Sequence, residues 1–210
     1  YQDVDYSYTS SNSQYSIQHW KNFAYDMSQE CDTNSPEILE VGSNDGTLLK
    51  FLKNTFEGIE PIGIDASPKM VEISKANGIN TLCGIFGDDL VNLDYLQDKT
   101  FDLIIANNVL NHSEDPKAFI LNASKLFRDQ KSFIVYELPY WKVLVDQSRY
   151  DQIYHEHISY FTIQNSINLA NKLNLEIFKI EINDYHGGSM RVFLGPKNGH
   201  KIEESVNRLL

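Results

Sequence analysis

Short apolar runs that alternate with helical stretches constrain this sequence more than any other feature. Runs at 37–41, 61–65 and 101–106 are each followed by a turn and then by residues spaced as on an amphipathic helix. The runs are largely apolar rather than strictly alternating, as in parallel strands that are covered on both faces. The pattern therefore predicts an α/β fold with a doubly wound parallel sheet.

The end of the chain breaks this rhythm. Two strand candidates, 175–182 and 190–194, follow each other without an intervening helix, and we expect them to close the sheet as an antiparallel hairpin. The full prediction is a Rossmann-like sheet of seven strands. We expect strands at 37–41, 61–65, 79–82, 101–106, 132–137, 175–182 and 190–194, and helices at 13–30, 47–54, 115–127 and 162–173, from Ser67 onward and from 201 onward. Ser67 and Thr162 are the expected caps of their helices, with Pro68 in the first helical position after Ser67.

No internal repeat or long linker divides the chain, so the prediction is one main domain over 31–196. A lead-in segment and N-terminal helix at 1–30 precede it, and the start of a C-terminal extension at 197–210 follows. The sequence begins with Tyr1 rather than Met, from which we expect an excised or processed piece.

Charge and cysteine content exclude several classes of protein. With 18 Lys+Arg, 29 Asp+Glu and a net charge of −11, the chain would be repelled by a nucleic-acid backbone. No apolar run approaches the ~18 residues of a membrane span, and no signal peptide is visible. Cys31 and Cys83 lack zinc-ligand spacing, so we expect small buried thiols in a reducing compartment, no metal and a cytoplasmic location.

A glycine turn follows the first predicted strand, where open α/β sheets bind ligands. It reads E-V-G-S-N-D-G over 40–46, and it lacks the dinucleotide fingerprint G-x-G-x-x-G because Asn44 and Thr47 replace two glycines. The second strand ends at Asp65, whose carboxylate can accept both hydroxyls of a ribose. An acid with a glycine turn, followed by an acid for the ribose, is typical of S-adenosylmethionine sites.

Four strings in the sequence resemble one family. They are E-V-G-S-N-D-G at 40–46, N-N-V-L-N-H at 107–112, Y-H-E-H-I-S-Y-F at 154–161 and H-G-G-S-M-R at 186–191. Together they are similar to the S-adenosylmethionine-dependent sugar C-methyltransferases of nucleotide-deoxysugar biosynthesis. The Y-H-E-H string is the most specific, and the likeness covers nearly the whole chain.

The resemblance implies an acceptor and two further domains. Family members carry a small zinc-binding domain before this region and a second Rossmann-like domain after it, and we expect both to be absent from this piece. The second domain is implied to hold part of the sugar nucleotide. The expected partner is therefore a small molecule, a nucleotide-linked keto sugar, with no nucleic acid and no membrane.

Carbon methylation next to a ketone needs an enolate, and an enolate needs a base. An imidazole suits this task because it titrates near pH ~6.5, and the resemblance places the base at His157. We expect Glu156 to orient or charge-balance the ring and Tyr154 to donate to the keto oxygen. The expected roles of His112 and Tyr8 are to stabilise the enolate oxyanion and to close over the substrate.

The predicted cofactor is S-adenosylmethionine, and its predicted contacts lie in turns that follow the strands. They are Glu40, Gly42, Asn44, Asp45, Gly46, Asp65, Ala66, Ser67, Phe86, Asn107 and Asn108.

Several of these residues have a structural alternative. His155 and His157 could both be satisfied structural histidines, or the H-x-H spacing could be half of a metal site. His112 could cap the helix that follows it, and Tyr8 could be ordinary packing. The H-G-G string at 186–188 is more often a tight turn than a catalytic element, although its glycines would let a substrate come near.

The remaining alternatives concern charge and function. Lys142, Arg149 and Arg191 are the cations nearest the predicted cleft, and a solvated surface position is their default. A methyltransferase for oxygen or nitrogen on another small molecule is one functional alternative. A non-catalytic scaffold module with a cofactor fold is the other.

Overall fold

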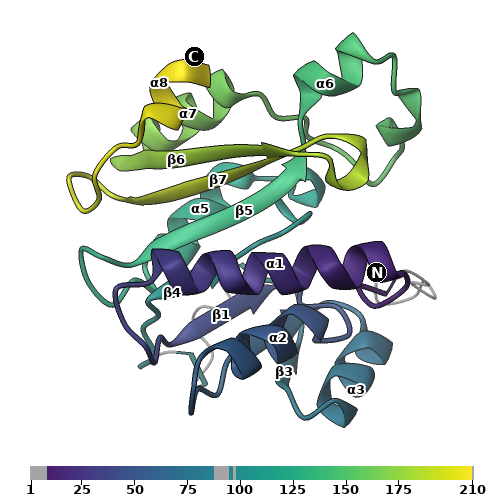
Figure 1. The fold of residues 1–210 in the computed structure, drawn as a ribbon, viewed down its shortest axis with the longest axis vertical. Helices are drawn as coiled ribbons and strands as arrows, with labels where there is room; N and C mark the ends of the chain where they lie inside the picture. Colours follow the sequence, from purple (N-terminus) through teal and green to yellow (C-terminus); the bar gives the residue numbers. More distant parts are fainter. Residues whose placement is uncertain (1–8, 88–94, 97, 210) are drawn as a thin grey trace. The chain divides into compact units, whose positions relative to one another are not determined.

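The sheet of the computed structural model, which describes residues 9–87, 95–96 and 98–209, has the strand order β3-β2-β1-β4-β5-β7-β6 (Figure 1). Neighbouring strands β1, β2 and β3 are parallel, whereas β7 is antiparallel to both β5 and β6. The predicted seven-stranded Rossmann-like fold with its closing hairpin is confirmed. The strands are β1 (Ile38–Val41), β2 (Ile62–Asp65), β3 (Asn80–Cys83), β4 (Leu103–Ile105), β5 (Phe133–Pro139), β6 (Leu175–Asn183) and β7 (Ser189–Pro196).

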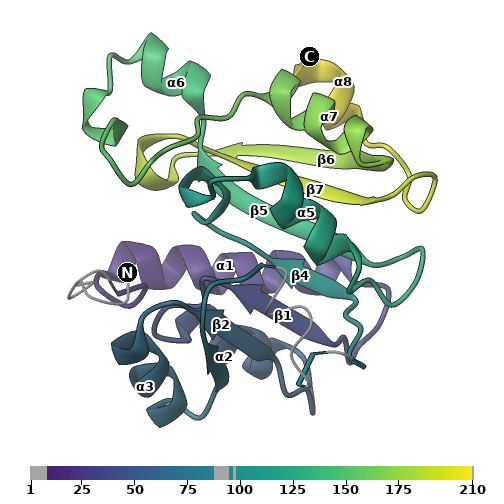
Figure 2. The same ribbon diagram turned by 180° about the vertical axis from the view of Figure 1, so that it is seen from behind.

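The chain forms two compact units, Tyr1–Ile104 and Ile105–Leu210, with the boundary inside β4. In the first unit, α1 packs beside α2, and α3 packs against β2 and β3 (Figures 1 and 2). Ser67 caps α3 and Pro68 opens it, as the sequence predicted. The described residues of this unit form the helices α1 (Gln14–Glu30), α2 (Thr47–Thr55) and α3 (Pro68–Ala76).

The N-terminal helix α1 follows the predicted spacing. It begins after Ser13, whose side chain accepts a hydrogen bond from the backbone of Ser16. Its buried face repeats every three or four residues, as an amphipathic helix requires. The buried residues are Ser16, Trp20, Phe23, Ala24 and Met27.

The second unit is built on β5, β7 and β6. Helices α7 and α8 pack against β6, and α5 packs against β5. Thr162 caps α7 as predicted, and Asn165 bonds back to the Thr162 backbone, so a capping box fixes the start of this helix. These three helices are α5 (Pro116–Ser124), α7 (Ile163–Lys172) and α8 (Glu204–Leu209).

The segment after β5 contains helical turns that the sequence did not predict. Figure 1 shows this segment extending beyond the end of β5. Helix α6 (Trp141–Asp146) has only six residues, and Tyr140 provides no side-chain cap, so neither periodicity nor a cap marks it in the sequence. A short 3-10 turn, η2 (Tyr150–Gln152), follows α6 in this segment. Elsewhere the described residues form η1 (Leu110–His112) before β5 and η3 (Tyr185–Gly187) between β6 and β7.

Composition led us to expect two buried thiols. Cys31 is half-buried and Cys83 is exposed at the end of β3, so this prediction is wrong for Cys83. Among the helices of the described residues, none combines the length and the apolar character needed to cross a membrane.

Gly46 ends the turn between β1 and α2 with a φ of +78°, and an added Cβ would lie 2.4 Å from Ser74 Oγ. That oxygen shares a buried 2.6 Å hydrogen bond with Thr81, which Gly46→Ala would disturb. Gly58 has a φ of +76° with nothing within 4 Å of an added Cβ. We expect Gly58→Ala to cost about 1–2 kcal/mol for the left-handed backbone, and Gly46→Ala at least ~1 kcal/mol more. Urea unfolding measures the difference, and equal losses would contradict the packing argument.

Candidate active site

The glycine turn of the first unit is held to β2 by backbone hydrogen bonds. Gly42, Asn44 and Gly46 have positive φ angles of 73°, 50° and 78°. The N–H groups of Gly42 and Ser43 both donate to the carbonyl of Ile64, at 2.8 and 3.0 Å. The turn therefore has a fixed position at the carboxyl end of β1, where the sequence placed the cofactor.

Asp65 ends β2 and is oriented by two backbone donors. Its Oδ2 accepts the N–H of Asn44 at 2.8 Å, and its Oδ1 accepts the N–H of Ser67 at 2.8 Å. Burial raises the pKa of Asp65, while these two hydrogen bonds act in the opposite direction. Each carboxylate oxygen can accept a second bond, so the carboxylate fits a pair of neighbouring hydroxyls such as those of a ribose.

Glu40 is a buried acid at the end of β1. Its side chain is 5% exposed, and Oε2 has no hydrogen-bond partner among the described residues. Burial is the main cause that raises its pKa well above the ordinary value, and the charges of Asp45 and Asp65 raise it further. An unpartnered oxygen beside two other acids fits the positively charged part of a ligand. The residues present thus fit S-adenosylmethionine, which carries an ammonium group, a sulfonium and a ribose.

The side chains of Asn44 and Asp45 are engaged within the chain. Asn44 Oδ1 accepts bonds from the N–H groups of Ser10 and Asp45, at 3.0 and 2.9 Å. Asp45 Oδ1 accepts the N–H of Thr47 at 3.1 Å. Asp45 Oδ2 accepts the N–H and the hydroxyl of Ser11, at 3.2 and 2.7 Å. These contacts attach the turn to residues 10 and 11, a role that the sequence did not predict.

The other residues predicted to bind the cofactor lie in different turns. Ser67 is buried as the cap of α3, with Ala66 half-buried next to it. Phe86 is buried after β3. Asn107 and Asn108 follow β4 in the second unit. Their contacts with a cofactor stay predictions.

The second unit places Tyr154 and His157 in direct contact. Tyr154 Oη lies 2.8 Å from His157 Nε2, and His157 Nδ1 lies 2.9 Å from the carbonyl oxygen of Gln152. Because a carbonyl only accepts, Nδ1 carries the proton, and Nε2 accepts from the Tyr154 hydroxyl. His157 is 8% exposed whereas Tyr154 is 42% exposed. The unprotonated Nε2 is therefore buried, and its hydrogen-bond partner Tyr154 is exposed to solvent.

His112 packs edge-on against His157, with the ring centroids 4.9 Å apart. Burial lowers the pKa of His112 to about 4, and the neighbouring His157 contributes, while a hydrogen bond with the Glu156 backbone acts the other way. Asp115 caps α5 by accepting the N–H of Ala118. The alternative role of His112 as the cap of this helix is therefore excluded.

The Y-H-E-H string forms a turn rather than an extended strand. The N–H of His157 donates to the carbonyl of Tyr154 at 3.0 Å. His155 is exposed, Glu156 is half-buried and His157 is buried. In the described part of the chain, no three His, Cys, Asp or Glu side chains come together as metal ligands would. The H-x-H spacing therefore has no third ligand there.

Glu137 and Arg191 form a buried ion pair where β5 and β7 lie in register. Arg191 Nε lies 2.9 Å from Glu137 Oε2, and Asn183 Nδ2 donates to the same oxygen at 2.9 Å. The expected surface position of Arg191 is therefore wrong, because a buried acid neutralises its guanidinium. The backbone of Glu137 also accepts from Asn108 N–H and donates to Asn107 Oδ1, which fixes the turn after β4.

The glycines of the H-G-G string make room for side chains of the same unit. A Cβ on Gly187 would lie 1.4 Å from Arg149 Nη1, and a Cβ on Gly188 would lie 2.5 Å from Val143 Cγ1. Arg149 is in turn paired with Asp151 at 2.9 Å. The glycines thus let α6 and the residues after it pack on the turn between β6 and β7, which explains them without a bound substrate.

Asn111 is a site residue that we did not predict. It is 3% exposed, and neither atom of its side-chain amide has a hydrogen-bond partner among the described residues. Its carbonyl accepts the N–H of Ser159 at 3.1 Å, which links η1 to the Y-H-E-H segment. Its position in the sequence between Asn108 and His112, two predicted site residues, is the signal that could have identified Asn111.

Tyr8, predicted to close over the substrate, lies outside the described residues.

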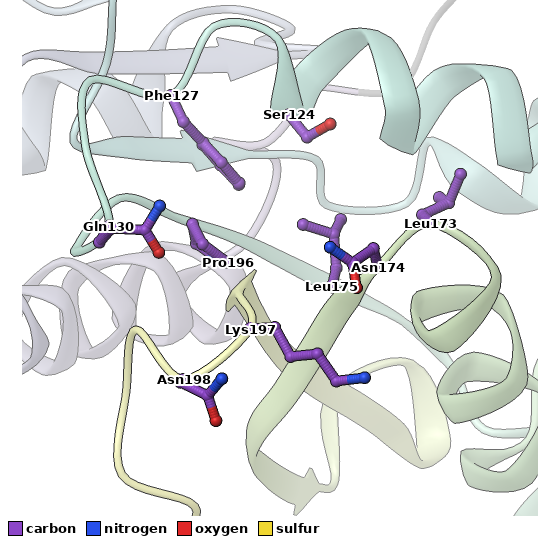
Figure 3. A pocket seen from close by; sticks show the side chains of 9 residues that line it. All are labelled: Ser124, Phe127, Gln130, Leu173, Asn174, Leu175, Pro196, Lys197 and Asn198. Atoms are coloured by element: carbon purple, nitrogen blue, oxygen red, sulfur yellow. The ribbon is translucent and has the colours of Figure 1, made fainter.

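The second unit also contains a cavity of about 570 Å³ (Figure 3). It is lined by residues before β5, at the start of β6 and after β7, among them Gln130, Leu175 and Lys197. Tyr154 and His157 instead come after the opposite end of β5, and a seven-residue strand is roughly 20 Å long. The cavity is therefore separate from the catalytic candidates.

Comparison with known proteins identifies related sequences. Residues 12–180 match the model of a family described as a methyltransferase domain. The C-methyltransferase NovU of Streptomyces niveus is 26% identical over 179 residues, which are 85% of this chain and 42% of that protein. The chain thus spans less than half the length of this relative.

Solved structures share the fold. The magnesium protoporphyrin IX methyltransferase ChlM of Synechocystis PCC 6803, with bound SAH, has a TM-score of 0.63 and 14% identity, covering 87% of this chain and 83% of that chain. A SAM-dependent methyltransferase of Thermotoga maritima has a TM-score of 0.63 and 16% identity, covering 85% of this chain and 91% of that chain. At these identities the likeness shows the fold alone.

The pKa of His112 predicts how the free energy of unfolding depends on pH. It falls from 6.5 to about 4 on folding, so the folded state disfavours the protonated ring. The stability that this ring contributes is complete above pH ~6.5 and is lost as the pH falls toward ~4. We expect His112→Asn to lose less free energy of unfolding than the wild type between pH ~7 and ~5, measured in urea. Equal losses would mean that the ring titrates normally.

Proposed function

The chain belongs to the methyltransferase family that matches residues 12–180 and uses S-adenosylmethionine, and on this premise we propose that it methylates a carbon next to the ketone of a nucleotide-linked deoxysugar. The observation that carries the proposal is the hydrogen bond between Tyr154 and His157, which supplies a neutral imidazole as base. The similarity to the C-methyltransferase NovU supports transfer to carbon. An oxygen or nitrogen acceptor would need a base but no donor for an enolate oxygen.

When bound, S-adenosylmethionine supplies an electrophilic methyl group on a positively charged sulfonium. We assign Asp65 to the ribose hydroxyls because backbone bonds hold both of its oxygens in place while leaving each a free lone pair. We assign Glu40 to the cationic end because its buried Oε2 has no partner in the described residues. The positive φ of Gly42 lets the turn pass close to these two acids.

In the proposed first step, His157 Nε2 takes the proton from the carbon next to the ketone. We assign the Tyr154 hydroxyl to the keto oxygen, so that acceptor binding turns this hydroxyl away from Nε2 and frees the lone pair. Burial lowers the pKa of His157, so the ring is neutral near pH ~7 and ready to accept a proton. Burial and the nearby Glu156 raise the pKa of Tyr154, so it remains a donor.

The step creates a positive charge on the imidazole and a negative charge on the keto oxygen, and residues of the chain stabilise both. The proton moves to Nε2, and the electron pair of the broken C–H bond forms a carbon–carbon double bond. The π pair of the carbonyl moves onto the keto oxygen, where the Tyr154 hydroxyl donates to it. The Glu156 carboxylate favours the imidazolium, and the Gln152 carbonyl keeps its bond to Nδ1. His112 fits the oxyanion role less well, because a ring with a pKa of about 4 is neutral and has a single N–H.

Deuterium exchange tests the base step without methyl transfer. With S-adenosylhomocysteine and a nucleoside-diphosphate keto-deoxysugar in D2O, the wild type is expected to exchange the proton next to the ketone. His157→Asn should slow this exchange by about 10²- to 10⁴-fold, because the positioned base is lost. His155→Asn, which changes the exposed histidine of the same string, should exchange at the wild-type rate.

Three results would oppose this assignment. A wild-type rate of deuterium exchange in His157→Asn would show that His157 is not the base. Methyl transfer to an oxygen or nitrogen acceptor, with no deuterium exchange, would favour the first alternative enzyme. Binding of S-adenosylhomocysteine with neither activity would favour the scaffold. Calorimetry with S-adenosylhomocysteine should give equal affinities for both histidine variants, since neither residue is assigned to the cofactor.

Glu40 gives a second prediction, on the cofactor. Burial, with the charges of Asp45 and Asp65, raises the pKa of Glu40 well above the ordinary value, so the free chain favours the protonated form of this carboxyl. The ammonium group of S-adenosylhomocysteine favours the ionised form, so binding should release a proton and tighten as the pH rises. Calorimetry in buffers of different ionisation enthalpy counts the protons. Glu40→Gln should abolish the release, and an unchanged release in this variant would contradict the assignment.

A further inference from the structure

Residues 9–13, which we name the N-terminal strap, are bonded at both ends. At one end, Ser13 caps α1 by accepting the N–H of Ser16 at 3.1 Å. At the other end, the N–H of Ser10 donates to Asn44 Oδ1 at 3.0 Å. The N–H and hydroxyl of Ser11 both donate to one oxygen of Asp45, the hydroxyl at 2.7 Å. The strap thus joins α1 to the turn that follows β1.

The partners of the strap are the residues that distinguish this turn from a glycine-rich one. Asn44 stands where the dinucleotide fingerprint has its second glycine, and it keeps a φ of +50°, which glycine adopts at lower cost. A glycine there would have no oxygen for Ser10. The side chains of Asn44 and Asp45 are 8% and 2% exposed, so their oxygens depend on protein donors.

The same turn connects the strap to the acid assigned to the ribose. Asn44 accepts from Ser10 through its side chain and donates through its backbone N–H to Asp65 Oδ2 at 2.8 Å. Asn44 therefore connects the strap directly to Asp65, the residue proposed to bind the ribose. A shift of the strap is transmitted to the orientation of the Asp65 carboxylate.

Charge gives a second link between the strap and the cofactor. Asp45 lies near Glu40 and Asp65, and its charge adds to burial in raising the pKa of those two acids. The two donors of Ser11 stabilise the Asp45 carboxylate. A cationic ligand would favour the ionised forms of Glu40 and Asp65. The strap and a cationic ligand therefore both stabilise negative charge at this turn.

From these contacts we propose that the N-terminal strap is part of the cofactor site, with Ser10 and Ser11 as positioning residues that act through Asn44 and Asp45. Docking of the strap and binding of the cofactor then reinforce each other, and the coupling is reciprocal. The inference rests on the cofactor half of the proposed function and is independent of the acceptor.

Hydrogen exchange observes the strap directly, because the backbone amides of Ser10 and Ser11 are themselves the donors. We expect S-adenosylhomocysteine to slow the exchange of these two amides in the intact chain. The amide of Cys31, which bonds to Met27 at the far end of α1, should not change and serves as the internal reference.

Affinity for S-adenosylhomocysteine tests the reciprocal effect. Ser11→Ala removes the hydroxyl donor and should weaken binding by about 3- to 10-fold. Ser11→Thr keeps a hydroxyl and should bind within about twofold of the wild type. Thr162→Ala is the matched control, because it removes the cap of α7 in the second unit and should lower the melting temperature without changing the affinity.

Two results would overturn the proposal while leaving the assignment of the acceptor untouched. One is exchange at Ser10 and Ser11 that does not respond to S-adenosylhomocysteine. The other is Ser11→Ala with wild-type affinity. A weakening of equal size in Thr162→Ala would also overturn it, because the effect would then be loss of general stability. A wild-type chain that does not bind S-adenosylhomocysteine would refute the cofactor assignment and the strap together.

Discussion

Two hydrogen bonds to one imidazole determine what the second unit can do chemically. The Gln152 carbonyl fixes the proton of His157 on Nδ1, so the lone pair is on Nε2, where the Tyr154 hydroxyl holds it. The turn that brings these residues together belongs to a segment packed on Gly187 and Gly188 through Val143 and Arg149. An imidazole without a net charge is thus held by a backbone carbonyl and a tyrosine hydroxyl rather than by an ion pair.

The two units use opposite electrostatic arrangements. The first unit collects Glu40, Asp45 and Asp65 at the ends of β1 and β2, where burial raises the pKa of two of them. Such a group favours a cationic ligand. In the second unit, burial instead lowers the pKa values of His112 and His157, which keeps both rings neutral. Each arrangement suits the step assigned to it, which is cation binding in one unit and proton abstraction in the other.

Much of the fold could be predicted from the sequence because its signals are local. The alternation of strands and helices, the caps at Ser67 and Thr162 and the closing hairpin all depend on residues close together in the chain. The burial of Arg191 could not be predicted, since its partner Glu137 lies 54 positions away in sequence. The role of Asn44 toward Ser10, 34 positions away, was hidden for the same reason.

The candidate site shows the same division. The Y-H-E-H string identified Tyr154, Glu156 and His157, but only the turn geometry distinguishes the buried His157 from the exposed His155. The pKa of His112 depends on its burial and on the neighbouring His157, which no local pattern encodes. Sequence reasoning therefore named the chemical groups, whereas the tautomer and protonation state required the three-dimensional contacts.

The ring nitrogens of His157 provide the most direct test of the central claim. In a chain labelled with ¹⁵N-histidine, NMR at neutral pH reports the protonation of each nitrogen separately, and His157→Asn assigns the signals. We expect a neutral ring with a protonated Nδ1 and an unprotonated Nε2, as the bonds to Gln152 and Tyr154 require. A protonated Nε2, in either a charged ring or the other tautomer, would contradict a base at this position.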